Sequence, residues 1–316
     1  YLCFTKSYFS RPDAQNAHTG MQGFRIEGIA MQNNKTAKLV CILRESGKKE
    51  FSLNDEPYKK FSEHIGKFPC VMISPDDAAL ITGSSEQRRD FIDTILAQLH
   101  KDYLQHLIHY KKILEQRNSL LKAAENNSPD AIVLSILDEQ LVPHGEKIYG
   151  YRKNFLASFL PQVQKEYVQL AGGDDAINLS YYSPLQSCSF SELLKQQLPR
   201  DIFLQRTGSG VHKDEIDITM SGMPFKSTAS QGQRKTLLFA LKLAEFTVLK
   251  ENKGFSPILL LDDVFEKMDE QRMNELMHRV CVQEEAQVFI TDTHRQRLES
   301  SLNALGVAFQ LVELKN

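Results

Sequence analysis

The stretch from residue 227 to residue 263 constrains this chain most, because it predicts a capped helix followed by a short apolar strand that ends in two acids. Ser230 is a good N-cap residue, and Gln233 stands three positions later, where its side-chain amide can close a capping box. Apolar residues then recur at helical spacing and predict one buried face, formed by Leu237, Leu241, Ala244 and Val248. On the opposite face we expect cationic side chains to reach solvent, namely those of Arg234, Lys235, Lys242 and Lys250.

The N-terminus of this helix is suited to an anion such as a phosphate group. Gly232 leaves the first turn without a side chain, and the adjacent Arg234 and Lys235 add positive charge. Unpaired backbone N–H groups and the positive end of the helix dipole favour the same ligand. An ordinary capped core helix is the alternative, and the local chemistry alone favours it because capping boxes are common.

Residues 258 to 261 form a continuous apolar run after Pro257, which predicts a parallel strand that is covered on both faces. Asp262 and Asp263 follow at its carboxyl end, where ligands bind in open α/β sheets. We expect one carboxylate to hold the Mg²⁺ of a bound nucleotide and the other to orient water. Capping of the next turn is the alternative role, but two adjacent acids after four buried apolar residues are unfavourable without a cation nearby.

The composition is typical of a large soluble enzyme. The chain has 316 residues, of which 41% are hydrophobic and 25% are charged, and its formal net charge is −2. A nucleic acid would therefore have to bind local basic patches, because the chain offers no global positive field. The five cysteines show neither close pairing nor metal-like spacing, and no apolar run approaches membrane-spanning length, so we expect a cytoplasmic protein with reduced thiols.

Several stretches, taken together, resemble one family of ATPases. Residues 230 to 233 resemble the signature motif of ABC-type ATPases, residues 258 to 263 their Walker B strand, and residues 264 to 269 the D-loop that follows it. Further stretches occur in the order of the RecF family, which is related to the Rad50 and SMC heads: Ile73-Ser74-Pro75-Asp76-Asp77, Gly83 with residues 88 to 93, Gln116-Arg117-Asn118 and residues 210 to 214. This resemblance covers almost the whole chain, which is identified as a member of the RecF family.

The resemblance implies an α/β fold, with an ABC-type (P-loop NTPase) head lobe that has a mixed sheet and an inserted α-helical lobe with a short antiparallel helical hairpin. Residues 1 to 75 would form the N-terminal part of the ATPase lobe, residues 76 to 198 the helical lobe, and residues 199 to 316 the C-terminal part. Within this plan, residues 22 to 53 predict an antiparallel meander, and two long apolar patterns between residues 103 and 163 predict the hairpin. We also expect a short helix that ends before Pro199 and a strand at residues 202 to 204.

The sequence G-x-x-x-x-G-K-[ST] of a P-loop does not occur in the chain, whose first residue is Tyr1. In RecF-like proteins the P-loop comes just before a segment that resembles Lys6-Ser7-Tyr8-Phe9. We therefore expect a fragment without the P-loop, inactive alone, of a full-length protein that is a weak ATPase. A degenerate ATPase is the alternative.

The resemblance also assigns roles to single residues. Asp262 would bind the metal, and Asp263 would be the catalytic residue that orients the attacking water. The residues expected to contact ATP are Ser230, Gln231, Gly232, Gln233, Asp269 and His294. The residues expected to contact DNA are Arg88, Arg89 and Lys213. Either Gln15 or Gln22 would serve as the metal-sensing glutamine.

Some residues depart from the family pattern. Gln231 replaces the first glycine of the commonest ABC signature, and Asp263 stands where many relatives have glutamate. Lys267-Met268 replaces the usual Glu-Leu before Asp269, and His294 is offset from the usual position of the residue that senses the γ-phosphate. The shorter Asp263 side chain suggests slow turnover, which suits a switch better than a motor.

By resemblance, the protein would be an ATP-dependent DNA-binding clamp of recombinational DNA repair and replication. ATP and Mg²⁺ would join two subunits into a homodimer on gapped DNA, at junctions of single-stranded and double-stranded DNA. RecO and RecR would be its partners in the loading of RecA. The alternatives are a non-hydrolysing DNA-binding scaffold module and a short Rad50-like or SMC-like head ATPase.

Overall fold

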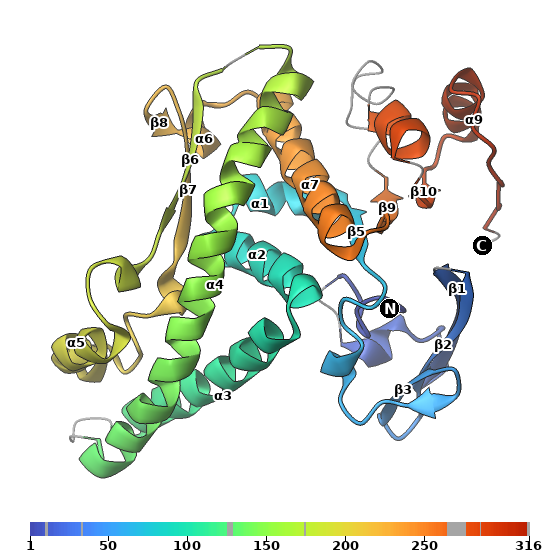
Figure 1. Ribbon diagram of the computed structural model, residues 1–316. Helices are drawn as coiled ribbons and strands as arrows, with labels where there is room; N and C mark the ends of the chain where they lie inside the picture. Colours follow the sequence, from blue (N-terminus) through green and yellow to red (C-terminus); the bar gives the residue numbers. More distant parts are fainter. Residues whose placement is uncertain are drawn as a thin grey trace. The chain divides into compact units, whose positions relative to one another are not determined.

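The computed structural model describes residues 1–9, 12–32, 34–124, 129–173, 175–263, 276–284 and 286–314, apart from the side chain of Arg297. The chain divides into two compact units, Tyr1–Pro69 and Cys70–Asn316, and each is described by itself (Figure 1). The helices and sheets together form a mixed α/β structure, which confirms the predicted class. The division into three lobes at residues 75 and 198 stays a prediction.

The first unit is built on a four-stranded sheet in the order β1-β2-β3-β4. The strands β1 (Phe24–Gln32), β2 (Lys35–Leu43), β3 (Lys49–Leu53) and β4 (Glu56–Pro57) pair antiparallel with their neighbours, which confirms the predicted meander. Two short 3₁₀ helices, η1 (Asp13–Asn16) and η2 (Phe61–Glu63), flank it. The core of this unit consists of Leu39, Cys41, Phe51 and Phe68.

The second unit contains a three-stranded parallel sheet in the order β10-β9-β5. Its strands are β5 (Cys70–Ile73), β9 (Ile258–Asp262) and β10 (Val288–Thr291). The long helix α7 (Gln231–Lys253) packs against it, and Leu259 and Leu261 of β9 are buried together with Phe239, Leu243, Phe246 and Leu249 of α7. The central position of β9 agrees with the strand predicted at residues 258 to 261.

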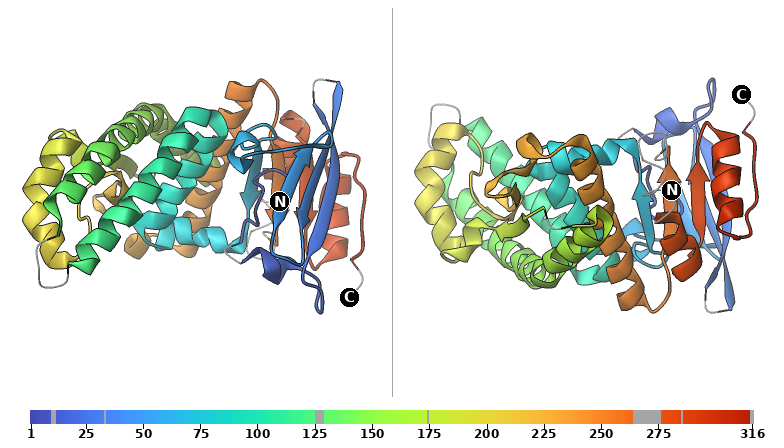
Figure 2. Two further views of the ribbon diagram at one scale, coloured as in Figure 1. Left: turned by 90° about the horizontal axis from the view of Figure 1, so that it is seen from below. Right: turned by 90° about the horizontal axis from the view of Figure 1, so that it is seen from above.

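The other side of α7 packs against a helical part that is visible to the left of it in Figure 1. This part begins with η3 (Pro75–Ala78) and α1 (Ala79–Thr82) and continues with α2 (Ser85–Leu99), α3 (Lys101–Ala123) and α4 (Ala131–Ala171). Helices α3 and α4 pack side by side as the predicted hairpin (Figure 2). Helix α4 ends at Ala171, because Gly172 adopts a left-handed conformation with φ of 69°.

A second antiparallel sheet, in the order β6-β7-β8, completes the helical part. It contains β6 (Ile177–Tyr182), β7 (Glu215–Met220) and β8 (Met223–Pro224), and the short helix α6 (Phe225–Thr228) leads from it to α7. Between β6 and β7 lie η4 (Pro184–Gln186), α5 (Phe190–Leu204) and η5 (Val211–Lys213). The chain ends with the π-helical turn η7 (His278–Gln283), β10 and α9 (Arg295–Ala304).

Helix α5 corrects two expectations. It does not end before Pro199 but continues to Leu204, so residues 202 to 204 are helical and not a strand. Proline inside a helix removes one backbone hydrogen bond and costs about 3 kcal/mol. Here Asp201 anchors the part of the helix that follows Pro199. Its buried carboxylate accepts hydrogen bonds from Arg117 Nη1 at 2.8 Å and from the backbone N–H of Gly208 at 2.8 Å. In the described part of the chain, no helix is long and apolar enough to cross a lipid bilayer.

Candidate functional site

The two acids predicted after the apolar strand lie at the carboxyl edge of the parallel sheet. Asp262 is the last residue of β9 and pairs in register with Thr291, the last residue of β10. The Thr291 hydroxyl group donates a hydrogen bond of 2.5 Å to Asp262 Oδ1, and the backbone N–H of Asp263 donates one of 3.1 Å to the Thr291 carbonyl. Neighbouring strands therefore hold both acids at the edge where α/β sheets bind ligands.

Asp263 has an unusual local structure. Its φ of 50° lies in the left-handed region, which is uncommon for residues other than glycine. Its Oδ1 atom is buried and accepts no hydrogen bond from any described residue. Neither Asp262 nor Asp263 forms an ion pair with a described cation, so the chain leaves negative charge at this edge.

This donor set fits Mg²⁺. The ion takes oxygen ligands and is often bound by one or two carboxylates together with substrate phosphates and water. The described residues contain no group of three or more His, Cys, Asp or Glu side chains that could hold a metal by themselves. The edge of β9 offers two carboxylates and the Thr291 hydroxyl group, which suits a metal that arrives with a phosphate ligand.

The second predicted element is the start of α7. Ser230 is its N-cap, and the capping box is present as predicted: Gln233 N–H donates to Ser230 Oγ at 3.2 Å, and Ser230 N–H donates to Gln233 Oε1 at 2.9 Å. Gln233 Nε2 also donates to Asp175 Oδ2 at 3.1 Å, which fixes the side chain. Ser230 and Gln231 are exposed, and Gly232 is half-buried, so the first turn is open to a ligand.

One chain does not bring these two elements together. The residues of α7 that pack with the sheet begin at Phe239, so Ser230 lies about 14 Å further along the helix axis at a rise of 1.5 Å per residue. Figure 1 shows the first turn of α7 on the side of α6, away from β9. His294, by contrast, follows β10 on the sheet side; it is exposed, and its backbone N–H donates to Asp292 Oδ1 at 2.6 Å. Asp269 and the D-loop lie outside the described residues.

The buried face of α7 is wider than predicted, and one expected surface cation lies inside it. Every residue from Thr236 to Phe246 is buried, including Lys242, whose ammonium group lies 3.4 Å from Asp77 Oδ1 and 3.7 Å from Glu245 Oε2. The expectation that Lys242 reaches solvent is therefore wrong, because α7 is enclosed between the parallel sheet and the helical part. Burial raises the pKa of Glu245 to about 7.

The three predicted DNA-binding residues meet at one loop, residues 206 to 215, although α2 and this loop are far apart in sequence. Arg88 of α2 forms an ion pair with Glu215. Arg89 donates through Nη1 to the backbone carbonyl of Asp214 at 2.8 Å. Lys213 lies on the same loop and is exposed. Arg88 thus differs from Arg89 and Lys213 in that a carboxylate neutralises its charge.

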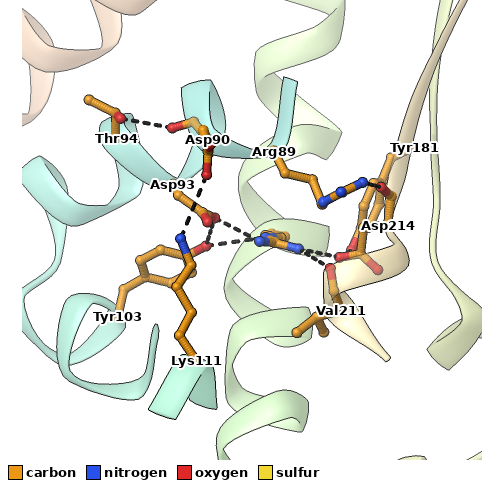
Figure 3. Close-up of polar contacts among 10 residues, drawn as sticks. Arg89, Asp90, Asp93, Thr94, Tyr103, Lys111, Tyr181, Val211 and Asp214 are labelled. Carbon is orange, nitrogen blue, oxygen red and sulfur yellow. Dashed lines mark hydrogen bonds and ion pairs between the residues drawn. The ribbon is translucent and has the colours of Figure 1, made fainter. Parts of the chain in front are cut away.

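A buried arginine that the sequence reading did not single out holds this loop (Figure 3). Arg152 of α4 donates through Nη1 to Asp214 Oδ2 and to the Val211 carbonyl, both at 2.7 Å, and through Nη2 to Asp93 Oδ1 at 2.7 Å. In Figure 3, Asp93 and Asp214 lie on opposite sides of this network. Tyr103 donates to Asp93 and accepts from Arg152 Nε at 3.1 Å. Burial raises the pKa of Tyr103 well above its ordinary value, which keeps the phenol as a donor.

A second arginine, Arg117 of α3, is fully buried and serves the other end of the loop. It contacts Asp138 through Nε at 2.6 Å, and Asp201 and the Thr207 hydroxyl group through Nη1 at 2.8 and 2.9 Å. Arg117 interrupts the apolar pattern of its helix, and Arg152 stands four residues after the buried Ile148. An arginine at a position where the helical pattern places a buried apolar residue is the sequence signal that could have indicated both networks.

His212 is held within the loop by two hydrogen-bonding contacts. Its Nδ1 atom lies 2.7 Å from the Tyr110 hydroxyl group, and its Nε2 atom lies 3.0 Å from the Thr207 carbonyl. Because that carbonyl can only accept, Nε2 donates and Nδ1 accepts from Tyr110. Burial lowers the pKa of His212 to about 4, so the imidazole is neutral at pH 7.

The chain is similar to known proteins over almost its whole length. The DNA replication and repair protein RecF of Flavobacterium johnsoniae is 39% identical over 315 residues, which cover 99% of this chain and 88% of the relative. The protein of the same name from Parabacteroides distasonis is 38% identical over 315 residues, which cover 100% of this chain and 86% of the relative. No family model matches the chain.

Two solved structures share the fold. They are described as the recombination mediator protein RecF in the RecFOR pathway, as RecF-ATPrS and as RecF-ATP. The first has a TM-score of 0.85 and is 26% identical, and the match covers 94% of this chain and 81% of that chain. The second has a TM-score of 0.83 and is 25% identical, and the match covers 93% of this chain and 81% of that chain. The fold and the acids at the end of the central strand define an ABC-type ATPase head with an inserted helical lobe. Within that class, the chain belongs to the RecF family of DNA replication and repair proteins, as the sequence motifs predicted.

Proposed function

We propose that the chain is a subunit of an ATP-dependent clamp on DNA, in which each nucleotide is bound between two copies. Asp262 of one copy would hold the Mg²⁺ that accompanies ATP, and Asp263 would orient the attacking water. Ser230 and Gly232 of the second copy would cover the γ-phosphate, with the N-terminus of α7 directed at the anion. His294 would sense the γ-phosphate, and Asp269 would contribute from the D-loop.

The observation that carries this proposal is the separation of the two elements within one chain. The acids follow β9 at the sheet edge, whereas the open first turn of α7 lies beyond the residues that pack against the sheet. An anion at the first turn of one copy and a metal at the sheet edge of another would join two chains through one nucleotide. Bound Mg²⁺ would supply charge neutralisation for the phosphates.

The biological role follows from the family. The relatives are DNA replication and repair proteins, and the solved neighbours are recombination mediators of the RecFOR pathway that are described with ATP or ATPrS. We infer that ATP closes a homodimer on gapped DNA at junctions of single-stranded and double-stranded DNA, and that hydrolysis reopens it. RecO and RecR would act with this clamp to load RecA onto the single strand.

A mixing experiment tests the shared site. We would place a P-loop segment ahead of Tyr1 and prepare two variants of this longer chain, Ser230→Arg and Asp263→Asn. Each variant alone should hydrolyse ATP very slowly, because both sites of its homodimer are defective. A mixed dimer contains one intact site, made of Asp263 from the first variant and Ser230 from the second, so mixing should restore hydrolysis. A mixture as inactive as its components would contradict a site shared between subunits.

The control separates the signature role from simple capping. Ser189 is the N-cap of α5 and forms the same kind of capping box, with Glu192. Ser189→Arg removes an equivalent cap, worth about 1 kcal/mol, from a helix that is not expected to contact nucleotide. Sedimentation should show that ATP still drives dimerisation of Ser189→Arg but not of Ser230→Arg. Equal dimerisation of both variants would leave Ser230 as an ordinary cap.

A further inference from the structure

The loop of residues 206 to 215 and the side chains that contact it include cations that lie outside the ion pairs of the described structure. Three arginines around it are each matched with carboxylates: Arg88 with Glu215, Arg117 with Asp138 and Asp201, and Arg152 with Asp93 and Asp214. These contacts engage each of the carboxylates on the loop, Asp214 and Glu215. With Arg89, Arg206 and Lys213 added, the region holds six cations and these five carboxylates, which gives it a net charge of +1.

Three further cations are present. Arg89, Arg206 and Lys213 form no ion pair with any described residue, and both Arg206 and Lys213 are exposed. Their charges act on one another: burial, followed by the positive charges of Arg206 and Arg89, lowers the pKa of the Lys213 ammonium group. The geometry agrees: Arg89 donates to the Asp214 carbonyl, next to Lys213, at 2.8 Å, and His212 joins the two ends of the loop through the Thr207 carbonyl, next to Arg206, at 3.0 Å. Like charges gathered in this way repel one another in the free protein and favour the binding of an anion.

The loop that carries these cations is rigid rather than adaptable. Asn118 Oδ1 accepts from the Thr207 N–H at 2.7 Å, and Asp201 Oδ1 accepts from the Gly208 N–H at 2.8 Å. Gly210 permits a close approach to the helices, because a Cβ atom there would lie 2.6 Å from the Tyr110 hydroxyl group and 2.9 Å from Phe190. A backbone fixed in this way holds charged side chains near one another without the entropic cost of ordering a mobile loop.

We propose that Arg89, Arg206 and Lys213 form a subsite for a phosphate group of a nucleic-acid backbone, an assignment that rests on the proposed function as a DNA clamp. Guanidinium groups match phosphate oxygens in a bidentate geometry, and lysine adds a compact charge. Contacts to phosphate do not read base sequence, so this subsite binds and orients the duplex without specificity. Arg88, which Glu215 neutralises, is not part of it.

The test is the salt dependence of DNA binding by the 316-residue chain without nucleotide. Binding of a fluorescent duplex is followed by anisotropy between about 50 and 200 mM salt for the wild-type chain and for the double variant Arg206→Gln/Lys213→Gln. Each phosphate contact contributes about 0.9 to the slope of log K against log salt, so the slope should fall by about 2 in the double variant. Both side chains are exposed and unpaired in the described structure, so the urea midpoint of the variant should equal that of the wild type.

Lys111→Gln is the matched control. Lys111 is an exposed lysine of the same unit, on α3, but its ammonium group lies 3.6 Å from Asp90 and is neutralised there. Its replacement removes one formal charge, as each substitution of the double variant does, and should leave the slope unchanged. A double variant that keeps the wild-type slope, or a control that loses as much slope, would overturn the subsite.

Inorganic phosphate distinguishes the two sources of the ligand. Side-chain NMR of Lys213 should shift with micromolar duplex and only with millimolar inorganic phosphate, because a backbone presents several phosphates at once. Saturation by inorganic phosphate at concentrations where the duplex has no effect would overturn the nucleic-acid assignment. If the longer chain with a P-loop segment binds no duplex at low salt even with ATP, the proposed clamp itself fails; if the 316-residue chain binds and the slope persists in the double variant, only the subsite fails.

Discussion

Aspartates occupy two contrasting regions of the second unit, and the chain treats them differently. Asp93 and Asp214 in the helical part share Arg152, and both are almost completely buried. Asp262 and Asp263 at the sheet edge have no cation among the described residues, although Asp263 Oδ1 is buried. In the helical part the counter-charge is built into the chain. At the sheet edge no described residue supplies it.

The difference gives a criterion for function that burial alone does not provide. A buried carboxylate with its own arginine serves structure, because its loss or exposure costs stability. A buried carboxylate atom without such a partner costs stability as it stands, which makes Asp263 and its neighbour Asp262 candidates for binding a ligand. The same criterion applies to cations at the loop of residues 206 to 215. Arg88 has a carboxylate partner there, whereas Arg89 and Lys213 form no ion pair with a described residue.

The largest effect is expected from removing the built-in counter-charge. Arg152→Met should lower the free energy of unfolding by 3 to 5 kcal/mol, roughly, because Asp93 and Asp214 stay buried without a cation. Urea denaturation of the 316-residue chain measures this. The control is Arg295→Met: Arg295 also contacts two carboxylates, Glu299 and Glu313, but it is exposed, so its loss should cost under about 1 kcal/mol. Similar losses of unfolding free energy in both variants would show that the buried ion pairs of Arg152 stabilise the chain no more than the exposed ion pairs of Arg295.

The unpaired acids should behave in the opposite way. In a chain that carries a P-loop ahead of Tyr1, Asp263→Asn should leave the urea midpoint unchanged or higher, while ATP hydrolysis slows by about 100-fold or more and closed dimers accumulate. Asp262→Asn should instead weaken binding of the Mg²⁺-nucleotide complex itself. Filter binding and phosphate release separate the two outcomes. Normal turnover in both variants would exclude these acids from the site.

His212 allows the rigidity of the loop to be tested through pH. Its folded pKa of about 4 lies below the ordinary 6.5, so between these values the unfolded chain binds a proton that the folded chain does not. The stability that depends on neutral His212 is therefore complete above pH 6.5 and declines as the pH falls, by at most about 1.4 kcal/mol per pH unit. His212→Gln lacks this dependence, so the stability difference between wild type and variant should shrink from pH 7 to pH 4.5. A difference that stays constant over this range would place His212 in solvent.

The smallest effects concern the caps. Ser230→Ala and Ser189→Ala should each lower the free energy of unfolding by about 1 kcal/mol, since both side chains accept from the N3 backbone N–H. Matched losses would show that the cap of α7 is energetically ordinary, whatever its role with nucleotide. Differential scanning calorimetry resolves such changes. A much greater loss at Ser230 would tie this residue to the core of the fold.

Local signals in the sequence predicted the local parts of the candidate site. The spacing of Ser230 and Gln233 predicted a capping box that is present, and the apolar run before Asp262 predicted the central strand of the parallel sheet. The meander of the first unit was confirmed for the same reason, because turn residues act on their immediate neighbours. The family motifs supplied the identity of the class.

Long-range contacts explain what the sequence reading missed. Pro199 is a valid stop signal, yet α5 passes through it because Asp201 is held by Arg117, a residue 84 positions away. Lys242 has the pattern of a surface lysine and is buried because Asp77, on another element, approaches it. Pairing of Arg88 with Glu215 depends on a separation of 127 positions. Periodicity and propensity within a window contain no information on such pairs.

Helix α7 has a mechanical consequence for the chain. Because every residue from Thr236 to Phe246 is enclosed by neighbours on both sides, the helix cannot bend or slide without moving the sheet and the helical part together. A displacement of its exposed first turn is therefore expected to move β9, the strand that bears Asp262. Contact at Ser230 and the position of the two acids would then be mechanically coupled within one subunit.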